Sequence, residues 1–217
     1  GLGDVYKRQA LSTSFHPFSV KQIEANYIYD FIIKHKLTRG FEIATGTGAS
    51  AAAAGLAFKE TNGLLVTMDA YIEENREHSH AYMSETNVTY QNACGFKMIS
   101  FLKEKYDLPV SIEVGWSPTD TERILLSALN LESPKPVLDY VFIDALHTTD
   151  AVLADIKSVM PFLKNENYAI FLHDTHAFDS RLDNFLTEHF GKSYEICPKC
   201  SVEDGGFNLS VVTDLTI

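Results

Sequence analysis

The chain has 217 residues, enough for one domain with a sizeable hydrophobic core. Its net charge of −11 argues against a nucleic-acid partner, because binding to a phosphate backbone draws on clustered lysine and arginine. No apolar run approaches the roughly 18 residues of a membrane span, and no secretory signal pattern opens the chain. Three cysteines do not make a disulfide framework. We therefore expect a cytoplasmic protein that acts on a small molecule.

The start of the chain differs from the rest. Residues 4–9 spell DVYKRQ, which resembles the translation of a transposon-derived sequencing adapter, a scar seen where assembled metagenomic reads are cut off. We expect residues 1–9 to be non-native and residues 10–217 to form a single domain whose own N-terminus is missing. The alternative is an ordinary polar tail, and under both interpretations the segment is left out of fold prediction.

Predicted helices and strands alternate along the chain. Apolar residues at helical spacing begin at Val20, and an alanine-rich segment follows the first strand. The expected helices include residues 20–37, 51–54, 86–106, 119–131, 152–163 and 180–190. The expected strands are residues 41–44, 63–68, 110–114, 137–143, 168–172, 194–196 and 207–213. This order predicts a doubly wound, Rossmann-like α/β fold with a mostly parallel seven-stranded sheet, helices on both faces and an antiparallel last strand.

A glycine turn joins the first strand to a helix within the segment FEIATGTGAS, residues 41–50. Gly46 and Gly48 permit a tight turn and let the backbone approach a ligand that a Cβ would exclude. The helix that follows directs backbone N–H groups at whatever lies over the turn. Glu42 is unusual, because an acid inside an apolar strand needs a partner, such as a cofactor cation or a turn amide. The segment predicts a site for a nucleotide-like cofactor.

Polar residues recur where the predicted strands end. In open α/β sheets, ligands bind outside the carboxyl ends of the strands. Asp69 ends the second strand, Asp144 the fourth, and His173 and Asp174 the fifth. Asp69 follows the glycine turn by about twenty residues, the spacing at which an acid binds ribose hydroxyls. A strand-terminal aspartate is as often only the cap of the next turn.

Together these motifs resemble the class I S-adenosylmethionine-dependent methyltransferases, from Phe41 to the C-terminus. FEIATGTGAS looks like their first motif, and Asp69 corresponds to their ribose-binding acid. Residues 139–176 are similar to a narrower branch of small-molecule O-methyltransferases, which includes sugar and antibiotic-tailoring enzymes. The hallmark of that branch is a strand ending in Asp, a nearby His, a helix with Ala-Asp, and a strand ending in an acidic pair or His-Asp. The resemblance implies S-adenosylmethionine as cofactor and a hydroxylated small molecule as substrate, and it is compatible with a homo-oligomer.

The resemblance also implies a set of cofactor-binding residues. They are Glu42, Ala44, Thr45, Gly46, Gly48, Ser50, Asp69, Trp116, Ser117 and Asp144. Trp116 would stack on adenine, although a lone tryptophan is more often a packing residue. Ser117 or backbone groups would replace the acid that the family often places near the adenine amine. Ala44 stands where the family usually has its leading glycine, which narrows the room for the cofactor.

In metal-dependent members of such families, a divalent cation binds the substrate oxygens and lowers their pKa. By resemblance, Asp144, His173 and Asp174 would be the ligands, and Mg²⁺ or another divalent cation would suit them. The expected catalytic residues are Asp144, His147 and His173, with His147 as the base or as the group that orients a substrate hydroxyl. Two alternatives stay open: His173 and Asp174 only cap their strand and the next helix, and His147 only bonds a loop backbone.

Two other functions fit part of the sequence. Gly46, Gly48 and Ala51 also satisfy a relaxed G-x-G-x-x-A fingerprint, as in an NAD-dependent oxidoreductase. Glu42 and the segment from Asp144 to Asp174 have no evident use in hydride transfer, so methyl transfer is the preferred interpretation. The third function is S-adenosylmethionine binding without catalysis.

Three further features carry smaller predictions. Cys197 and Cys200 resemble half of a zinc ribbon, but a structural zinc needs four ligands, so we expect a hairpin turn with two free thiols. His173 or His176 would have to complete the alternative zinc site. Residues 71–85 are polar and form either a lid over the substrate or a solvated surface helix. Asp155 is expected to anchor its helix rather than to react.

Overall fold

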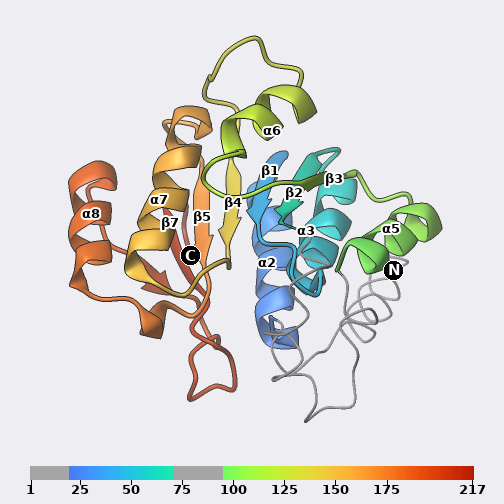
Figure 1. Cartoon of the computed structure of the whole chain (residues 1–217). Coiled ribbons are helices and arrows are strands. Elements are labelled where there is room, and N and C mark those ends of the chain that lie inside the picture. Colours follow the sequence, from blue (N-terminus) through green and yellow to red (C-terminus); the bar gives the residue numbers. More distant parts are fainter. Residues whose placement is uncertain (1–19, 71–94) are drawn as a thin grey trace, which may run out of the picture.

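The computed structural model describes residues 20–70 and 95–217, and one seven-stranded sheet runs through its centre (Figure 1). The strands are β1 (Arg39–Ile43), β2 (Leu64–Asp69), β3 (Val110–Val114), β4 (Tyr140–Ile143), β5 (Ala169–Leu172), β6 (Glu195–Ile196) and β7 (Ser210–Thr213). Their order in the sheet is β3-β2-β1-β4-β5-β7-β6. Strands β1 to β5 are parallel, and β7 is antiparallel to both β5 and β6. The predicted fold class is confirmed, including the antiparallel last strand.

Helices cover both faces of the sheet (Figure 1). One layer consists of α2 (Gln22–His35), α3 (Ala49–Glu60) and α5 (Gly95–Tyr106), and the other of α6 (Thr121–Ala128), α7 (Thr149–Val159) and α8 (Ser180–Phe190). Two short 3₁₀ helices, η1 (Met160–Phe162) and η2 (Thr175–Ala177), follow α7 and β5. Among the described helices, none combines the length and apolar character needed to cross a bilayer.

Several elements are shorter than predicted, and in one case a backbone contact is the reason. The predicted strand over residues 137–143 begins only at Tyr140, because the N–H groups of Val137 and Leu138 donate to the Phe162 carbonyl. The predicted helix over residues 119–131 ends at Ala128, and Asn130 then takes a left-handed conformation. For the predicted helix over residues 86–106, only the part from Gly95 onward falls within the described residues.

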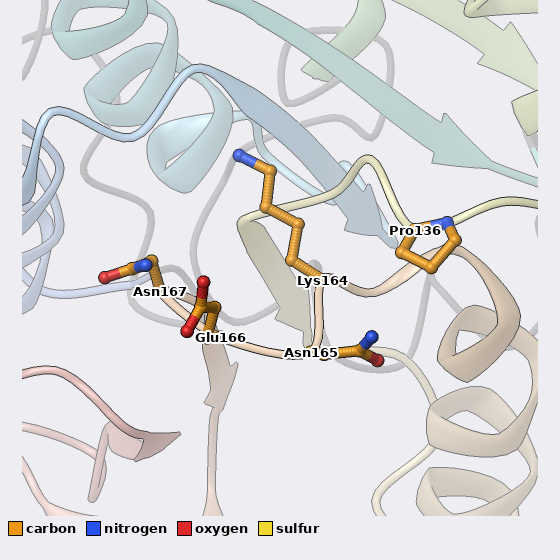
Figure 2. Close-up of a pocket in the computed structure, with 5 residues that line it drawn as sticks. All are labelled: Pro136, Lys164, Asn165, Glu166 and Asn167. Carbon is orange, nitrogen blue, oxygen red and sulfur yellow. The ribbon is translucent and has the colours of Figure 1, made fainter.

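A polar cavity of about 640 Å³ lies at the amino ends of β4 and β5 (Figure 2). Its lining comes from the two loops that precede these strands: Pro136, Lys164, Asn165, Glu166 and Asn167. Lys164 donates to the buried carboxylate of Asp139 at 2.8 Å, so this side chain holds the loop to the residue that precedes β4. Because ligands of such sheets bind at the carboxyl ends, we do not assign this cavity to catalysis.

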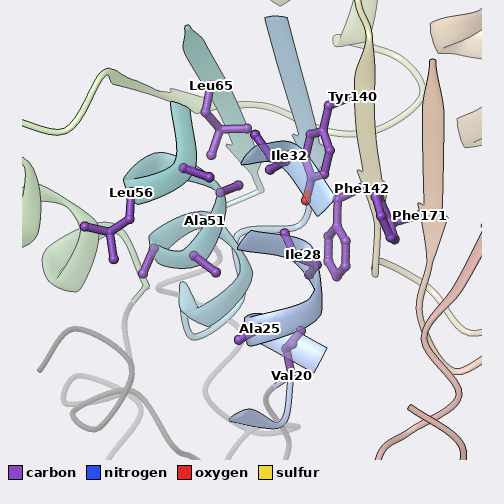
Figure 3. Packing of buried hydrophobic residues seen from close by; sticks show 14 of the residues in the cluster. Val20, Ala25, Ile28, Ile32, Ala51, Leu56, Leu65, Tyr140, Phe142 and Phe171 are labelled. Atoms are coloured by element: carbon purple, nitrogen blue, oxygen red, sulfur yellow. The ribbon is translucent and has the colours of Figure 1, made fainter. Parts of the chain in front are cut away.

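The core consists of two apolar layers, one on each side of the sheet. Alternate residues of a strand point to opposite faces, so Tyr140, Phe142 and Phe171 pack against α2 and α3 (Figure 3). Phe41 and Ile43 point the other way, toward α6, α7 and α8. Burial of each such side chain stabilises the fold by about 1.5–3 kcal/mol. By the same alternation, Glu42 points into the layer of α2 and α3, where an acid needs a polar partner.

Candidate functional site

Asp144, His147, His173 and Asp174 meet at the carboxyl ends of β4 and β5. Oδ1 of Asp144 lies 3.2 Å from Nδ1 of His173 and 3.2 Å from Nε2 of His147. Oδ2 of Asp174 lies 3.3 Å from the same nitrogen of His173 and 3.4 Å from that of His147. Carboxylate oxygens and imidazole nitrogens therefore alternate around a closed ring of four atoms, which we call the Asp/His ring. The residues predicted as catalytic and as metal ligands lie together.

The local backbone brings the two halves of this ring together. Strands β4 and β5 are adjacent and parallel, and the N–H of His173 donates to the Ile143 carbonyl at 3.2 Å. Consecutive residues of a strand point to opposite faces, which would separate His173 from Asp174. Asp174 instead adopts φ 52°, a left-handed conformation that ends the strand. Its carboxylate consequently turns back toward the ring of His173.

Glu24 of α2 forms the floor of the site, and sequence reasoning missed it. It is fully buried, and its Oε2 lies 3.2 Å from Nε2 of His173. The same oxygen accepts from the Lys21 N–H at 2.9 Å, while Oε1 accepts from the N–H groups of Phe207 at 2.6 Å and Leu209 at 3.3 Å. A signal was present in the sequence, because an acid at position 24 interrupts the apolar stripe of this helix.

Charge is concentrated in the Asp/His ring. Burial alone would lower the pKa of His173, but the Asp144 carboxylate and hydrogen bonds to Asp144, Asp174 and Glu24 raise it to about 12. Burial opposes ionisation of Asp144, yet the neighbouring imidazoles lower its pKa. The hydrogen bond to Asp144 raises the pKa of His147. The proton on His173 thus balances the carboxylates around it.

The glycine turn lies at the end of β1. Ala44, Gly46 and Gly48 all have positive φ, at 72°, 52° and 85°. A Cβ on Gly46 would meet no atom within 4 Å, so the turn is open at this residue. A Cβ on Gly48 would lie 2.8 Å from Cε of Met98, so this second glycine makes room for α5 instead. Gly46 therefore leaves space for a ligand, as predicted, whereas Gly48 leaves space for α5.

Asp69 is bonded directly to the turn. Its Oδ2 accepts from the Gly46 N–H at 3.0 Å, as expected of the turn-capping alternative. This bond places the carboxylate at the end of β2 beside the open part of the turn. The position of Asp69 is compatible with the predicted contact with ribose, which stays a prediction.

Glu42 has hydroxyl partners, where a cofactor cation or a turn amide was expected. Its Oε2 accepts from the Thr67 hydroxyl, and Ser50 supplies a second hydrogen bond. Thr45 lies beside them, with its Oγ1 2.7 Å from that of Thr67. Oε1 of Glu42 is buried and has no hydrogen-bond partner within the described residues. Burial, only partly offset by the hydrogen bonds from Ser50 and Thr67, raises the pKa of Glu42 to about 8, so the group is largely protonated at neutral pH.

Trp116 and Ser117 occupy the loop after β3. The Trp116 side chain is 56% exposed, so it is available for stacking and is not part of the core. The Ser117 hydroxyl donates to the buried Asp155 of α7. This bond directs the hydroxyl proton toward α7 and connects the loop to that helix, and the hydroxyl oxygen keeps lone pairs that can accept a hydrogen bond.

The comparison with known proteins identifies the family. A family model described as a methyltransferase domain matches residues 41–175, more than half of the chain. The chain belongs to this methyltransferase family. The match confirms the predicted resemblance to the class I methyltransferases. No curated protein sequence matches this methyltransferase.

Solved structures show the same fold at low sequence identity. The O-methyltransferase from Bacillus cereus has a TM-score of 0.58 and 13% identity, over 96% of this chain and 88% of the other. The methyltransferase PaMTH1 from Podospora anserina gives 0.57 and 14%, over 97% and 87%. TomG from Streptomyces achromogenes, an O-methyltransferase involved in tomaymycin synthesis, gives 0.52 and 15%, over 96% and 89%.

The cysteine pair of this methyltransferase follows β6. Cys197 and Cys200 are both buried and free, and the Cys200 N–H donates to the Cys197 carbonyl at 3.0 Å within a turn. Burial raises the pKa of both thiols, that of Cys200 to about 12. Within residues 20–70 and 95–217, the one cluster suited to a metal is Asp144, His173 and Asp174. Cys197 and Cys200 lie in a turn, as predicted, and form no disulfide with each other. The predicted lid or surface helix over residues 71–85 lies outside the described residues.

Proposed function

We propose that this methyltransferase transfers a methyl group from S-adenosylmethionine to a hydroxyl oxygen of a small molecule, with a divalent cation at the Asp/His ring. The observation that carries the proposal is the position of this ring, on the same edge of the sheet as the glycine turn. The Bacillus cereus and Podospora anserina structures contain SAH, and that of TomG contains SAM. These neighbours support the choice of cofactor.

The glycine turn fits such a cofactor. The backbone is open at Gly46, where a Cβ would meet no atom within 4 Å, and α3 begins three residues later. We assign Asp69 to the ribose hydroxyls and the exposed Trp116 to the adenine face. Glu42, Ala44, Thr45 and Ser50 would shape the methionine end of the site, with Glu42 as an uncharged, hydrogen-bonding group.

The Asp/His ring fits a divalent cation. Asp144, His173 and Asp174 each offer one donor atom, and the three atoms lie within 4.8 Å of one another. Such a cation acts as a Lewis acid that lowers the pKa of a bound hydroxyl. The two carboxylates would hold it, together with Nδ1 of His173.

We assign the proton transfer to His147. Its side chain is 49% exposed, so a substrate can reach it, while its Nε2 faces Asp144 and Asp174. When Nε2–H is donated to these carboxylates, Nδ1 is left to accept the hydroxyl proton. The carboxylates also stabilise the imidazolium that results, which makes the imidazole of His147 a better base.

The test combines binding with turnover. Calorimetric titration of the full chain with S-adenosylmethionine and with NAD, each with and without a divalent cation, should show binding of the first ligand only. Formation of S-adenosylhomocysteine with a panel of catechols, phenols and sugars should then depend on the cation and on His147. Binding of NAD without binding of S-adenosylmethionine would overturn the proposal. Binding of S-adenosylmethionine without turnover on any acceptor would favour a non-catalytic module.

A further inference from the structure

We infer that Glu24 is a positioning residue that fixes His173 as a nitrogen ligand, so that the Asp/His ring prefers a transition-metal ion such as Zn²⁺ or Co²⁺ over Mg²⁺. The inference rests on the cation site proposed above and goes beyond it in two ways. It names the class of metal, and it gives a role to a residue outside the matched segment, residues 41–175.

Glu24 is held too firmly to act as a mobile carboxylate. Three backbone N–H groups bind it, from Lys21 in the same helix and from Phe207 and Leu209 in the segment before β7. Both carboxylate oxygens are engaged, and the side chain is fully buried. Its remaining contact is with Nε2 of His173 at 3.2 Å. The carboxylate therefore lies at a fixed place behind the imidazole, on the side away from Asp144 and Asp174.

This contact determines which nitrogen of His173 can bind a metal. Carboxylates only accept hydrogen bonds, and they lie at both nitrogens of His173, Glu24 at Nε2 and Asp144 and Asp174 at Nδ1. A cation held by Asp144 and Asp174 would displace a proton from Nδ1, whereas Glu24 keeps the proton on Nε2. The lone pair is then on Nδ1, the nitrogen that lies 3.2 and 3.3 Å from the oxygens of Asp144 and Asp174. Metal-binding histidines typically donate their second N–H to a carboxylate in this way, which orients the ring and raises its basicity.

The resulting donor set indicates the metal. Mg²⁺ prefers oxygen ligands and keeps several waters, whereas imidazole suits zinc and related ions. Two carboxylates and one imidazole leave a fourth position open, as in catalytic zinc sites. Ligands about 2.0–2.2 Å from a tetrahedral ion are about 3.3–3.6 Å apart. The nitrogen-to-oxygen distances of 3.2 and 3.3 Å in the ring are close to this spacing.

The experiment measures metal affinity directly, without turnover. Purified full-length protein, stripped of metal, is titrated with Co²⁺, Zn²⁺ and Mg²⁺ by calorimetry, and Co²⁺ binding is also followed by its visible absorption. We expect Co²⁺ and Zn²⁺ to bind at least about 100-fold more tightly than Mg²⁺. Glu24→Gln should weaken Co²⁺ binding by about 10–100-fold, because the fixed acceptor for Nε2–H is lost. His173→Asp should reduce the preference over Mg²⁺ to about 10-fold or less, because the site then contains only oxygen donors.

A matched control separates this role from a structural one. Asp139 is also buried and accepts two backbone N–H groups, from Thr38 and Arg39, at the opposite edge of the sheet. Asp139→Asn should lower the melting temperature, as Glu24→Gln does, without changing Co²⁺ affinity. If Glu24→Gln does not fold, the ratio of Co²⁺ to Mg²⁺ affinity in the unaltered protein and in His173→Asp still decides the metal class.

Three results would overturn the inference. Equal affinities for Mg²⁺ and Co²⁺ in the unaltered protein would refute the metal class, and unchanged Co²⁺ affinity in Glu24→Gln would refute the role of Glu24. Absence of binding by all three ions would show that the ring is an ion-pair cluster only. Since S-adenosylmethionine binding is measured separately, this last result would remove the cation and leave methyl transfer to be tested on its own.

Discussion

The carboxyl edge of the sheet is built by two different means. At the ends of β4 and β5, charged side chains contact one another, and the buried Glu24 carboxylate is held by three backbone N–H groups. At the ends of β1 and β2, close backbone contacts form the glycine turn, and the partners of the buried Glu42 among the described residues are hydroxyl groups. The buried acid of the first half is thus held by backbone N–H groups, whereas the buried acid of the second half is more stable when protonated.

The largest expected effect is that of removing Glu24. Glu24→Ala leaves three N–H groups and Nε2 of His173 without their acceptor in a buried place, which should lower the free energy of unfolding by about 3–5 kcal/mol. Glu42→Ala should lower it by only about 1–2 kcal/mol, because the Thr67 hydroxyl can still bond to that of Thr45. Denaturant unfolding of both variants gives the comparison. Equal losses would show that the two carboxyl groups are held alike.

The next effect is a pH dependence that belongs to Glu42. Its pKa is about 8 in the folded protein against 4.5 for an ordinary glutamate, so between these values the folded state binds one more proton than the unfolded state. Stability due to this group is fully present below pH 4.5 and is lost as the pH rises through 8, with a slope of at most about 1.4 kcal/mol per pH unit.

Glu42→Gln isolates this contribution, because the amide cannot titrate and has nearly the same shape. The difference in unfolding free energy between the variant and the unaltered protein, measured at pH 5, 6.5 and 8, should shift in favour of the variant as the pH rises. Other titrating groups cancel in this difference. A constant difference across this range would mean that Glu42 is ionised in the folded protein.

In both halves of the carboxyl edge, the sequence predicts the features that depend on local patterns. Apolar runs and their spacing predict the seven strands, and the rule that ligands bind at the carboxyl ends of strands groups Asp144 with His173 and Asp174. Glu24 escaped because it contacts a residue 149 positions away in the chain, and no local pattern encodes such a pairing. The hydroxyl partner of Glu42 on the neighbouring strand, Thr67, was not predicted for a related reason.

Gly95, the first residue of α5, packs against the glycine turn, in the half of the carboxyl edge at the ends of β1 and β2. A Cβ there would lie 2.4 Å from the Gly46 carbonyl oxygen and 2.9 Å from the Gly48 nitrogen, and backbone atoms cannot move aside as a flexible side chain can. Gly95→Ala should therefore lower the free energy of unfolding by about 1–3 kcal/mol and weaken S-adenosylmethionine binding, without changing Co²⁺ affinity. Gly191→Ala, at a helix end with no atom near its Cβ position, is the control that should leave cofactor binding intact. If the two variants bound the cofactor equally well, the contact of α5 with the turn would have no role in the site.

Ala44→Gly should have the smallest effect, which is an increase in stability. Ala44 takes φ 72°, a conformation that disfavours any residue with a Cβ by about 1–2 kcal/mol. Ala44→Gly removes this strain but increases the freedom of the unfolded chain, so we expect a net gain of about 0.5–1 kcal/mol. Lys36→Gly is the matched control, because Lys36 has φ 54° at the end of α2. Both variants should melt at a higher temperature, whereas only Ala44→Gly should bind S-adenosylmethionine more tightly, since only there does a methyl group narrow the turn. A gain in affinity from both would show that overall stability, rather than the shape of the turn, limits cofactor binding.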